Sequence, residues 1–209
     1  MYNDASLFLE LKFYKEWQVA ISPERIRWNS RYSDNSFLPN WGPDISLAQR
    51  MGELPKGRCL DFACGPGANS LFLAKRGYVV DALDFSDVAI EMLRRASYGE
   101  GVSDKVNLLL GDLKEHPLEV ENYDLVVSFW FPLGGLMPRI VEALKPEGVL
   151  LHKVHTLHQQ RYDPKCDRTL CVAPNELQTM AEGLETLHYE EVDERDNAHA
   201  LLIARKPPQ

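Results

Sequence analysis

A short glycine-containing segment is the part of the sequence best suited to binding a ligand. It reads Cys64-Gly65-Pro66-Gly67 and stands between an apolar run and a segment with helical spacing. Glycine lets the backbone approach a ligand closely and adopt angles that a β-carbon would forbid. The free N–H groups at the start of a following helix suit an anionic group such as a carboxylate. The segment therefore predicts a binding loop between a strand and a helix.

Three aspartates accompany this loop. Asp61 lies inside the apolar run before it, an unusual place for a carboxylate without a partner. Asp84 ends the next apolar run, where an acidic side chain can accept hydrogen bonds from both hydroxyls of a ribose. Asp112 follows the third run, where it could accept a hydrogen bond from an adenine amino group. Each has a structural alternative, namely a satisfied carboxylate, a helix cap and a turn residue, but together with the loop they favour a nucleoside-containing ligand.

The elements that must position these residues alternate between strands and helices. We expect strands over residues 58–63, 78–83, 106–110, 124–129 and 149–154, and a hairpin of strands 186–191 and 199–205 around Asp196-Asn197. Helices are expected over about 68–76, 87–96, 136–144 and 174–182, with Ser86 and Asp87 as an N-cap and Gly77 as a C-cap. Residues 6–20 also have helical spacing, and residues 35–43 are expected to form a loop. This order predicts an α/β fold, a doubly wound, seven-stranded, mostly parallel sheet with an antiparallel C-terminal hairpin.

Length, composition and charge limit the possible functions. A chain of 209 residues with 44% apolar and 26% charged residues suits one domain. It has no apolar stretch long enough to span a membrane, and its first residues lack the basic start of a signal peptide, so we expect a cytoplasmic location. The net charge of −8 argues against a nucleic-acid partner. The four cysteines form neither a disulfide nor a zinc framework and are expected to be reduced.

The motifs resemble those of a known enzyme family. The run from Cys59 to Ser86, followed by LLLGDL, YDLVVSF and LKPEGVLL, resembles the successive motifs of class I S-adenosylmethionine-dependent methyltransferases, in order and in spacing. The upstream WNSRY segment and the ending HYEEVDERDNAHALLIARK look like the small bacterial group that includes the tellurite-resistance and thiopurine methyltransferases. The resemblance runs from about Trp28 to Lys206. It implies a Rossmann-like fold over residues 1–209, with 1–45 as an N-terminal helical or lid segment.

The resemblance also implies roles for individual residues. Asp61, Gly65 and Gly67 would hold the methionine end of S-adenosylmethionine, Asp84 its ribose and Asp112 its adenine. Asn69 stands where the family places glycine or asparagine, whereas a dinucleotide loop would have glycine in place of Ser70. The remaining expected cofactor-binding residues are Ala63, Phe85, Leu113 and Ser128, and Trp28, Arg31 and Tyr32 as lid residues. For Trp28, packing at the edge of the domain is the alternative.

The acceptor end is expected after the fourth and fifth strands. The fourth strand leads into Phe129-Trp130-Phe131-Pro132, which lacks the Asp/Asn-Pro-Pro motif of amino-methylating enzymes and suits a flat or apolar acceptor, or simply completes the core. His152 and His155 are the candidate catalytic bases, with surface polar residues as the alternative. Histidines three residues apart fit neither one strand face nor the usual helical zinc pattern, so we expect no metal.

Taken together, the residues and the resemblance predict a methyltransferase that acts on a small-molecule acceptor as a monomer or homodimer. The type of acceptor stays open: it can be a thiol, a selenium or tellurium species, a hydroxyl or a carboxyl. A protein that binds S-adenosylmethionine or S-adenosylhomocysteine without turnover, as a sensor or scaffold, is the alternative. A nicotinamide dehydrogenase and a nucleic-acid methyltransferase are weaker competitors, disfavoured by Ser70 and by the net charge.

Overall fold

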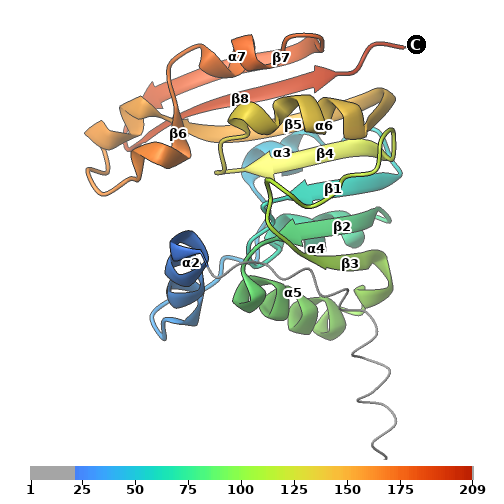
Figure 1. Ribbon diagram of the computed structural model, residues 1–209, viewed down its shortest axis with the longest axis vertical. Coiled ribbons are helices and arrows are strands. Elements are labelled where there is room, and N and C mark those ends of the chain that lie inside the picture. The colour runs from blue at the N-terminus through green and yellow to red at the C-terminus, as the bar shows by residue number, and fades with distance from the viewer. Residues whose placement is uncertain (1–21, 209) are drawn as a thin grey trace, which may run out of the picture.

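The computed structural model describes residues 22–208, which form one central sheet with helices on both faces (Figure 1). The helix expected over residues 6–20 lies outside this range. The sheet follows the order β3-β2-β1-β4-β5-β8-β7, and a further short strand, β6, pairs with β5. The strands are β1 (Arg58–Phe62), β2 (Val79–Asp84), β3 (Val106–Leu110), β4 (Tyr123–Phe129), β5 (Leu144–Thr156), β6 (Cys171–Val172), β7 (Glu185–Glu194) and β8 (Asn197–Arg205).

The direction of the strands confirms the expected fold class. β1 pairs in parallel with β2 and β4, β2 with β3, and β4 with β5, while β8 is antiparallel to both β5 and β7. The chain leaves β1 toward β2 on one side and later returns to β4 on the other, so the loops after β1 and β4 diverge. In such sheets a crevice opens at the carboxyl ends of the strands, at this switch point.

The helices form two layers. Leu47 of α3 (Ile45–Arg50), Leu71 of α4 (Ala68–Ala74) and Leu93 of α5 (Asp87–Gly99) belong to the core on one face. On the other face, α6 (Met137–Ala143) and α7 (Glu176–Met180) cover the second core. The remaining helix, α2 (Pro23–Ser33), buries no residue and lies near the carboxyl ends of β1 and β2 (Figure 1). Among residues 22–208, no helix is both long and apolar enough to cross a membrane.

Two details differ from the sequence-based expectations. The segment 145–148, which lies between the expected helix 136–144 and the expected strand 149–154, is part of β5, because Leu144 already pairs with Tyr123 before the ladder resumes at Val149 opposite Leu125. Glu147 takes a φ of 67° there, so these residues form an irregularity in the strand. The connection between the expected strand 149–154 and the expected helix 174–182, for which no element was expected, contains β6 and two 3-10 helices, η4 (Leu157–Arg161) and η5 (Arg168–Leu170).

Buried Asp81 shows how this sheet accommodates a carboxylate. It lies in β2 and accepts hydrogen bonds from the Arg58 guanidinium at 2.8 Å, from Asn107 Nδ2 at 2.7 Å and from the Tyr123 hydroxyl at 2.9 Å. The three donors come from β1, β3 and β4. A buried carboxylate with a cation and two further donors is satisfied inside the protein and stabilises the sheet.

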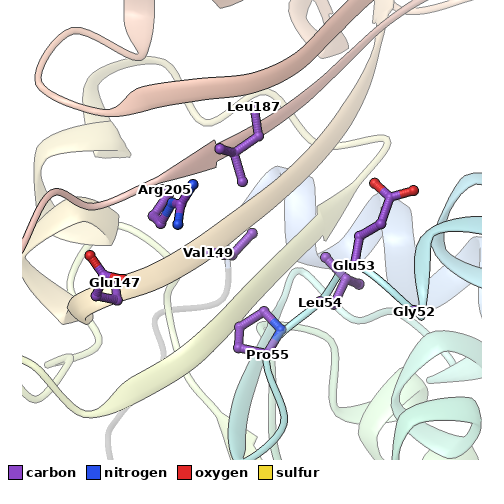
Figure 2. A pocket seen from close by; sticks show the side chains of 8 residues that line it. All are labelled: Gly52, Glu53, Leu54, Pro55, Glu147, Val149, Leu187 and Arg205. Atoms are coloured by element: carbon purple, nitrogen blue, oxygen red, sulfur yellow. The ribbon is translucent and has the colours of Figure 1, made fainter.

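A pocket lies near the amino ends of β1 and β5, whereas the glycine loop follows the carboxyl end of β1 (Figure 2). Its walls come from the segment before β1, the beginning of β5, β7 and the end of β8, and its lining residues are Gly52, Glu53, Leu54, Pro55, Glu147, Val149, Leu187 and Arg205. It is therefore separate from the crevice at the switch point.

Two glycines with the same backbone conformation provide a test of the packing around α4. Gly67 and Gly77 have φ values of 89° and 90°, but a β-carbon at Gly67 would lie 2.3 Å from Cδ1 of buried Leu93, whereas nothing lies within 4 Å at Gly77. We expect Gly77→Ala to lower the free energy of unfolding by about 1–2 kcal/mol through backbone strain alone. Gly67→Ala should cost about 1–3 kcal/mol more through overpacking. Urea unfolding of both variants measures the difference, and equal losses would contradict the packing argument.

Candidate active site

The loop after β1 is held in place by the carboxylate at the end of β2. Gly65 has a φ of 54° and donates its N–H to Asp84 Oδ2 at 2.8 Å. The other carboxylate oxygen of Asp84 accepts the N–H of Ser86 at 2.8 Å. Asp84 is 4% exposed, so the two backbone donors replace water that the carboxylate loses on burial. The expected loop and its expected acidic partner are thus brought together.

Asp61 and Asp84 form a buried acidic pair without a counter-ion in the described part of the chain. Asp61 accepts a hydrogen bond from the Ser70 hydroxyl at 2.5 Å, and unlike Asp81 neither residue forms an ion pair within residues 22–208. Burial raises the pKa of Asp61 to about 7 and that of Asp84 to about 6, despite these hydrogen bonds. Desolvated carboxylates of this kind are suited to a ligand that brings positive charge or hydroxyl donors.

Helix α2 covers the glycine loop with an aromatic residue. A β-carbon placed on Gly65 would lie 3.2 Å from the Tyr32 hydroxyl oxygen. The Tyr32 ring also packs on Trp28, at 5.6 Å between centroids, and edge-on against Phe37 at 5.3 Å. Burial, and next to it the charge of Asp84, raises the pKa of Tyr32. Arg31 is exposed and lies over the Trp28 ring at 5.3 Å. Of the three expected lid residues, Tyr32 therefore comes closest to the glycine loop.

Polar contacts fix α2 on two sides. Asn29 donates to Asp87 at 2.7 Å and accepts from the Ser86 hydroxyl at 2.6 Å, and Arg25 forms an ion pair with Asp87 at 2.9 Å. On the other side, Arg27 forms an ion pair with Asp167, 140 residues further along the chain. Asn29 was not among the residues expected at the site. Its position inside the WNSRY segment, whose neighbours were singled out, was the signal available.

Several other expected cofactor-binding residues already have partners inside the protein. Asn69 Oδ1 accepts the N–H of Asp44 at 2.9 Å, and Asp112 Oδ1 accepts the N–H of Lys114 at 2.8 Å. Gly111 donates to the Asp84 carbonyl oxygen at 3.0 Å, which sets Asp112 close to Asp84. Ser128 is fully buried in β4 with no hydrogen-bond partner for Oγ among the described residues. Ala63, Phe85 and Leu113 pack in or against the core on the face of α6.

An aromatic and basic cluster occupies the carboxyl ends of β4 and β5. Trp130 has a φ of 62°, and its ring lies 4.4 Å from that of His155 and 6.1 Å from that of His199. Lys153 Nζ lies 4.8 Å from the Trp130 ring centroid and forms a buried ion pair with Asp44 at 3.1 Å. The ion pair joins β5 to the start of α3. His199 was not expected at this site, because β8 is antiparallel and distant in sequence. Lys153 was not expected either, because nothing in the sequence around it indicates its partner Asp44.

The two candidate catalytic histidines differ in accessibility. His152 is 0% exposed and its Nδ1 lies 3.1 Å from the Ser128 carbonyl oxygen, while burial lowers its pKa to about 4. His155 is half-buried, on the opposite face of β5, with Nδ1 3.3 Å from the Ala198 carbonyl oxygen. A carbonyl oxygen only accepts, so Nδ1 carries the proton and Nε2 of His155 has a free lone pair. Within residues 22–208, no three His, Cys, Asp or Glu side chains are grouped to hold a metal ion.

Comparison with known proteins relates this site to a family. A family described as "Methyltransferase domain" matches residues 59–148, the part from β1 to the beginning of β5. A probable S-adenosyl-L-methionine-dependent methyltransferase of Haemophilus influenzae, TehB, is 28% identical over 166 residues, which are 71% of this chain and 57% of that protein. The chain belongs to the class I S-adenosylmethionine-dependent methyltransferases. Its cofactor is S-adenosylmethionine.

The relatives of this methyltransferase differ in what they modify. A tRNA (uracil(54)-C(5))-methyltransferase of Pyrococcus horikoshii is 31% identical over 126 residues, which are 58% of this chain. The chain spans 28% of the length of that relative and 57% of the length of TehB.

Solved structures agree on the fold. The crystal structure of TehB from Haemophilus influenzae has a TM-score of 0.65 at 21% identity, covering 88% of this chain and 67% of that one. A solved structure described as "Conversion of a Disulfide Bond into a Thioacetal Group during Echinomycin Biosynthesis" has a TM-score of 0.71 at 20% identity. The match covers 88% of this chain and 92% of that one.

The residues of the site fit the family's cofactor. S-adenosylmethionine carries positive charge on its sulfonium and ammonium groups, which complements the uncompensated carboxylates of Asp61 and Asp84. Gly65 leaves the loop without a side chain beneath Tyr32, where a β-carbon would already be close to the hydroxyl oxygen. The fit therefore rests on charge as well as on the sequence motif.

The contacts of Asn29 predict a role in retaining the cofactor. Asn29→Ala removes both side-chain hydrogen bonds to the start of α5 and should weaken S-adenosylhomocysteine binding about tenfold, or about 1.4 kcal/mol. Because α2 buries no residue, thermal stability should change little. Ser30→Ala, an exposed neighbour on the same helix, is the matched control. Calorimetric titration of the three proteins checks this, and equal affinities would remove Asn29 from the site.

Proposed function

We propose that this chain transfers a methyl group from S-adenosylmethionine to a small-molecule acceptor. The observation that carries the proposal is the attachment of α2 on both sides of the site. Arg25 and Asn29 bind Asp87 on α5, and Arg27 binds Asp167 beside η5. A helix held at both sides above the glycine loop limits the size of an acceptor that enters, which favours a small molecule over a folded macromolecule.

The proposed cofactor contacts follow from the site. Asp61, Gly65 and Gly67 hold the methionine end, Asp84 accepts the ribose hydroxyls, Asp112 binds the adenine and Tyr32 covers the loop. S-adenosylmethionine supplies an electron-poor methyl group on a sulfonium sulfur. The protein's task is then to hold an acceptor in line with that carbon and to exclude water, and α2 is suited to the second role.

His155 is the proposed base for an acceptor that must lose a proton. Burial is the largest cause that lowers its pKa, and the Lys153 ammonium group lowers it further. The imidazole is therefore neutral at pH 7, with Nε2 available to accept a proton. The Trp130 ring stacked on His155 holds the imidazole in one orientation. His152, with no exposed atom, is the less suitable of the two expected bases.

A nucleic-acid acceptor is less well supported, although two relatives act on tRNA according to their names. Those relatives are matched over 28% and 35% of their length, so the match leaves most of each one out. The net charge of −8 opposes binding to phosphates. Protein arginine methyltransferases are matched over still shorter parts, 20% and 18% of their length.

Cofactor binding can be tested with a pair of aspartate variants from one strand. Wild-type protein should bind S-adenosylhomocysteine, and not NAD, in calorimetric titrations. Asp84→Asn should weaken this binding at least tenfold, about 1.4 kcal/mol or more, because the amide no longer offers two acceptors to the ribose and to the Gly65 and Ser86 N–H groups.

Asp81→Asn is the matched control, since Asp81 is equally buried three residues earlier but binds Arg58, Asn107 and Tyr123 instead. It should lower stability without changing affinity at a temperature where the protein is folded. Failure of the folded wild-type protein to bind S-adenosylhomocysteine would contradict the proposed function. Binding without product from any acceptor would support the sensor or scaffold alternative.

The proposed base predicts a pH profile. Because His155 must be unprotonated and its pKa is lowered, kcat/KM should rise with pH through a value below 6.5 and be level at neutral pH. His155→Gln should lower kcat by about 10²–10⁴-fold and abolish this acid limb. His158→Gln, which removes only a contact to Asp193, is the control and should keep the wild-type profile. An unchanged acid limb in His155→Gln would exclude His155 as the base.

A further inference from the structure

Two cysteines lie side by side in the segment after β5. The Sγ atoms of Cys166 and Cys171 are 3.6 Å apart, and both residues are half-buried. The segment between them contains η5, and Cys171 begins β6, where it pairs with His155 of β5. The pair therefore lies next to the proposed base, on the acceptor side of the site.

The backbone between the cysteines is held in a tight turn. Asp167 caps η5 by accepting the N–H of Thr169 at 2.9 Å, and its carbonyl oxygen is 3.5 Å from Cys171 Sγ. Gln160 donates to the Cys166 carbonyl oxygen at 3.3 Å. These contacts bring both sulfur atoms to the same side of the turn, so a covalent bond between them needs an approach from 3.6 Å to about 2.05 Å without unfolding the turn.

The same turn is attached to α2. Asp167, which directly follows Cys166, forms the ion pair with Arg27. Five residues further along the helix, Tyr32 lies against the glycine loop at Gly65. Whatever fixes the position of Asp167 therefore also restrains the middle of the helix that covers the loop.

We propose that Cys166 and Cys171 form a reversible disulfide in reaction with a small-molecule disulfide, and that this bond fixes Asp167 so that α2 stays closed. The effect on α2 rests on the proposed function, whereas the disulfide itself does not. This differs from the sequence-based expectation that the four cysteines are reduced and form no disulfide framework. A metal is the less suitable ligand for this pair, because no third His, Cys, Asp or Glu in the described range joins it in a metal-binding group.

The reaction proceeds in two exchange steps. Burial, and after it the hydrogen bond with Cys166, raises the pKa of Cys171 to about 12, so Cys171 keeps its proton and the Cys166 thiolate attacks first. One thiol leaves and a mixed disulfide forms on Cys166, which removes the neighbouring charge that opposes ionisation of Cys171. Cys171 then loses its proton and attacks the Cys166 sulfur, releasing the second thiol. The two cysteines lose two electrons and two protons, and the small disulfide is reduced to two thiols.

Oxidised glutathione is the probe for the first part of the proposal. After treatment of the full chain, the intact mass should fall by two hydrogens. Trypsin cleaves after Lys165 and Arg168, so peptide 166–168 should remain attached to peptide 169–195 until a reductant is added. Cys166→Ser and Cys171→Ser should each abolish this link. Modification of both cysteines by glutathione without a link between them would overturn the disulfide.

The release of S-adenosylhomocysteine tests the coupling to α2. In stopped-flow measurements, the oxidised protein should release the ligand several-fold more slowly than the reduced protein, and a reductant should restore the faster rate. Asp167→Asn keeps a residue that can cap η5 but loses the ion pair with Arg27. This variant should form the disulfide normally and release the ligand at one rate in both redox states.

The outcomes separate the two proposals. A linked wild-type protein with equal release rates in both redox states would overturn the coupling. So would a redox-dependent rate that persists in Asp167→Asn. If the reduced protein binds no S-adenosylhomocysteine, the proposed function fails, whereas the peptide link is still decided by the mass measurement.

Discussion

The burial of one carboxylate, Asp84, is the constraint on which the site depends. An ionised carboxylate removed from water must be given donors, and here they are the N–H groups of Gly65 and Ser86. Ser86 in turn caps α5 by accepting the Ala89 N–H at 3.1 Å, and its hydroxyl donates to Asn29 of α2. The glycine loop, the start of α5 and the covering helix are therefore tied to the end of β2. A change at Asp84 acts on all three at once.

The contrast between Asp81 and Asp84 separates structural from ligand-binding carboxylates. Both are buried in β2, three residues apart. Asp81 meets a guanidinium, an amide and a phenol from three strands, whereas Asp84 meets only backbone N–H groups, and burial raises its pKa to about 6. The protein thus leaves negative charge uncompensated at the carboxyl end of the sheet. A ligand that supplies positive charge and hydroxyl donors stabilises the buried, ionised carboxylate, and this stabilisation contributes to the free energy of binding.

The sequence was sufficient to predict what depends on local patterns. Strand order along the chain, the glycine loop and the N-cap at Ser86 all follow from residues close to one another. The expected C-cap at Gly77 is wrong by two residues, because α4 ends at Ala74 with Lys75 as its C-cap. What it did not predict are contacts between distant segments. Arg27 and Asp167 are 140 positions apart, and Lys153 meets Asp44 across 109 positions. Nothing in either local sequence indicates such a partner. The opposite facing of His152 and His155 does follow from local sequence, because strand alternation in β5 sets residues three apart on opposite faces. Which of the two faces is fully buried depends on the distant segments that cover the sheet.

The contacts around Asp44 show how the attachment of α3 to the sheet differs from that of α2. Lys153 holds the Asp44 carboxylate and Asn69 holds its backbone N–H, so the start of α3 is fixed to β5 and to α4. α2 ends at Ser33, and its polar contacts to the rest of the protein are surface ion pairs to Asp87 and Asp167 and the hydrogen bonds of Asn29. Exposed ion pairs contribute little to stability, whereas the buried pair at Asp44 is costly to break by removing one partner. The start of α3 is therefore held more firmly to the sheet than α2 is.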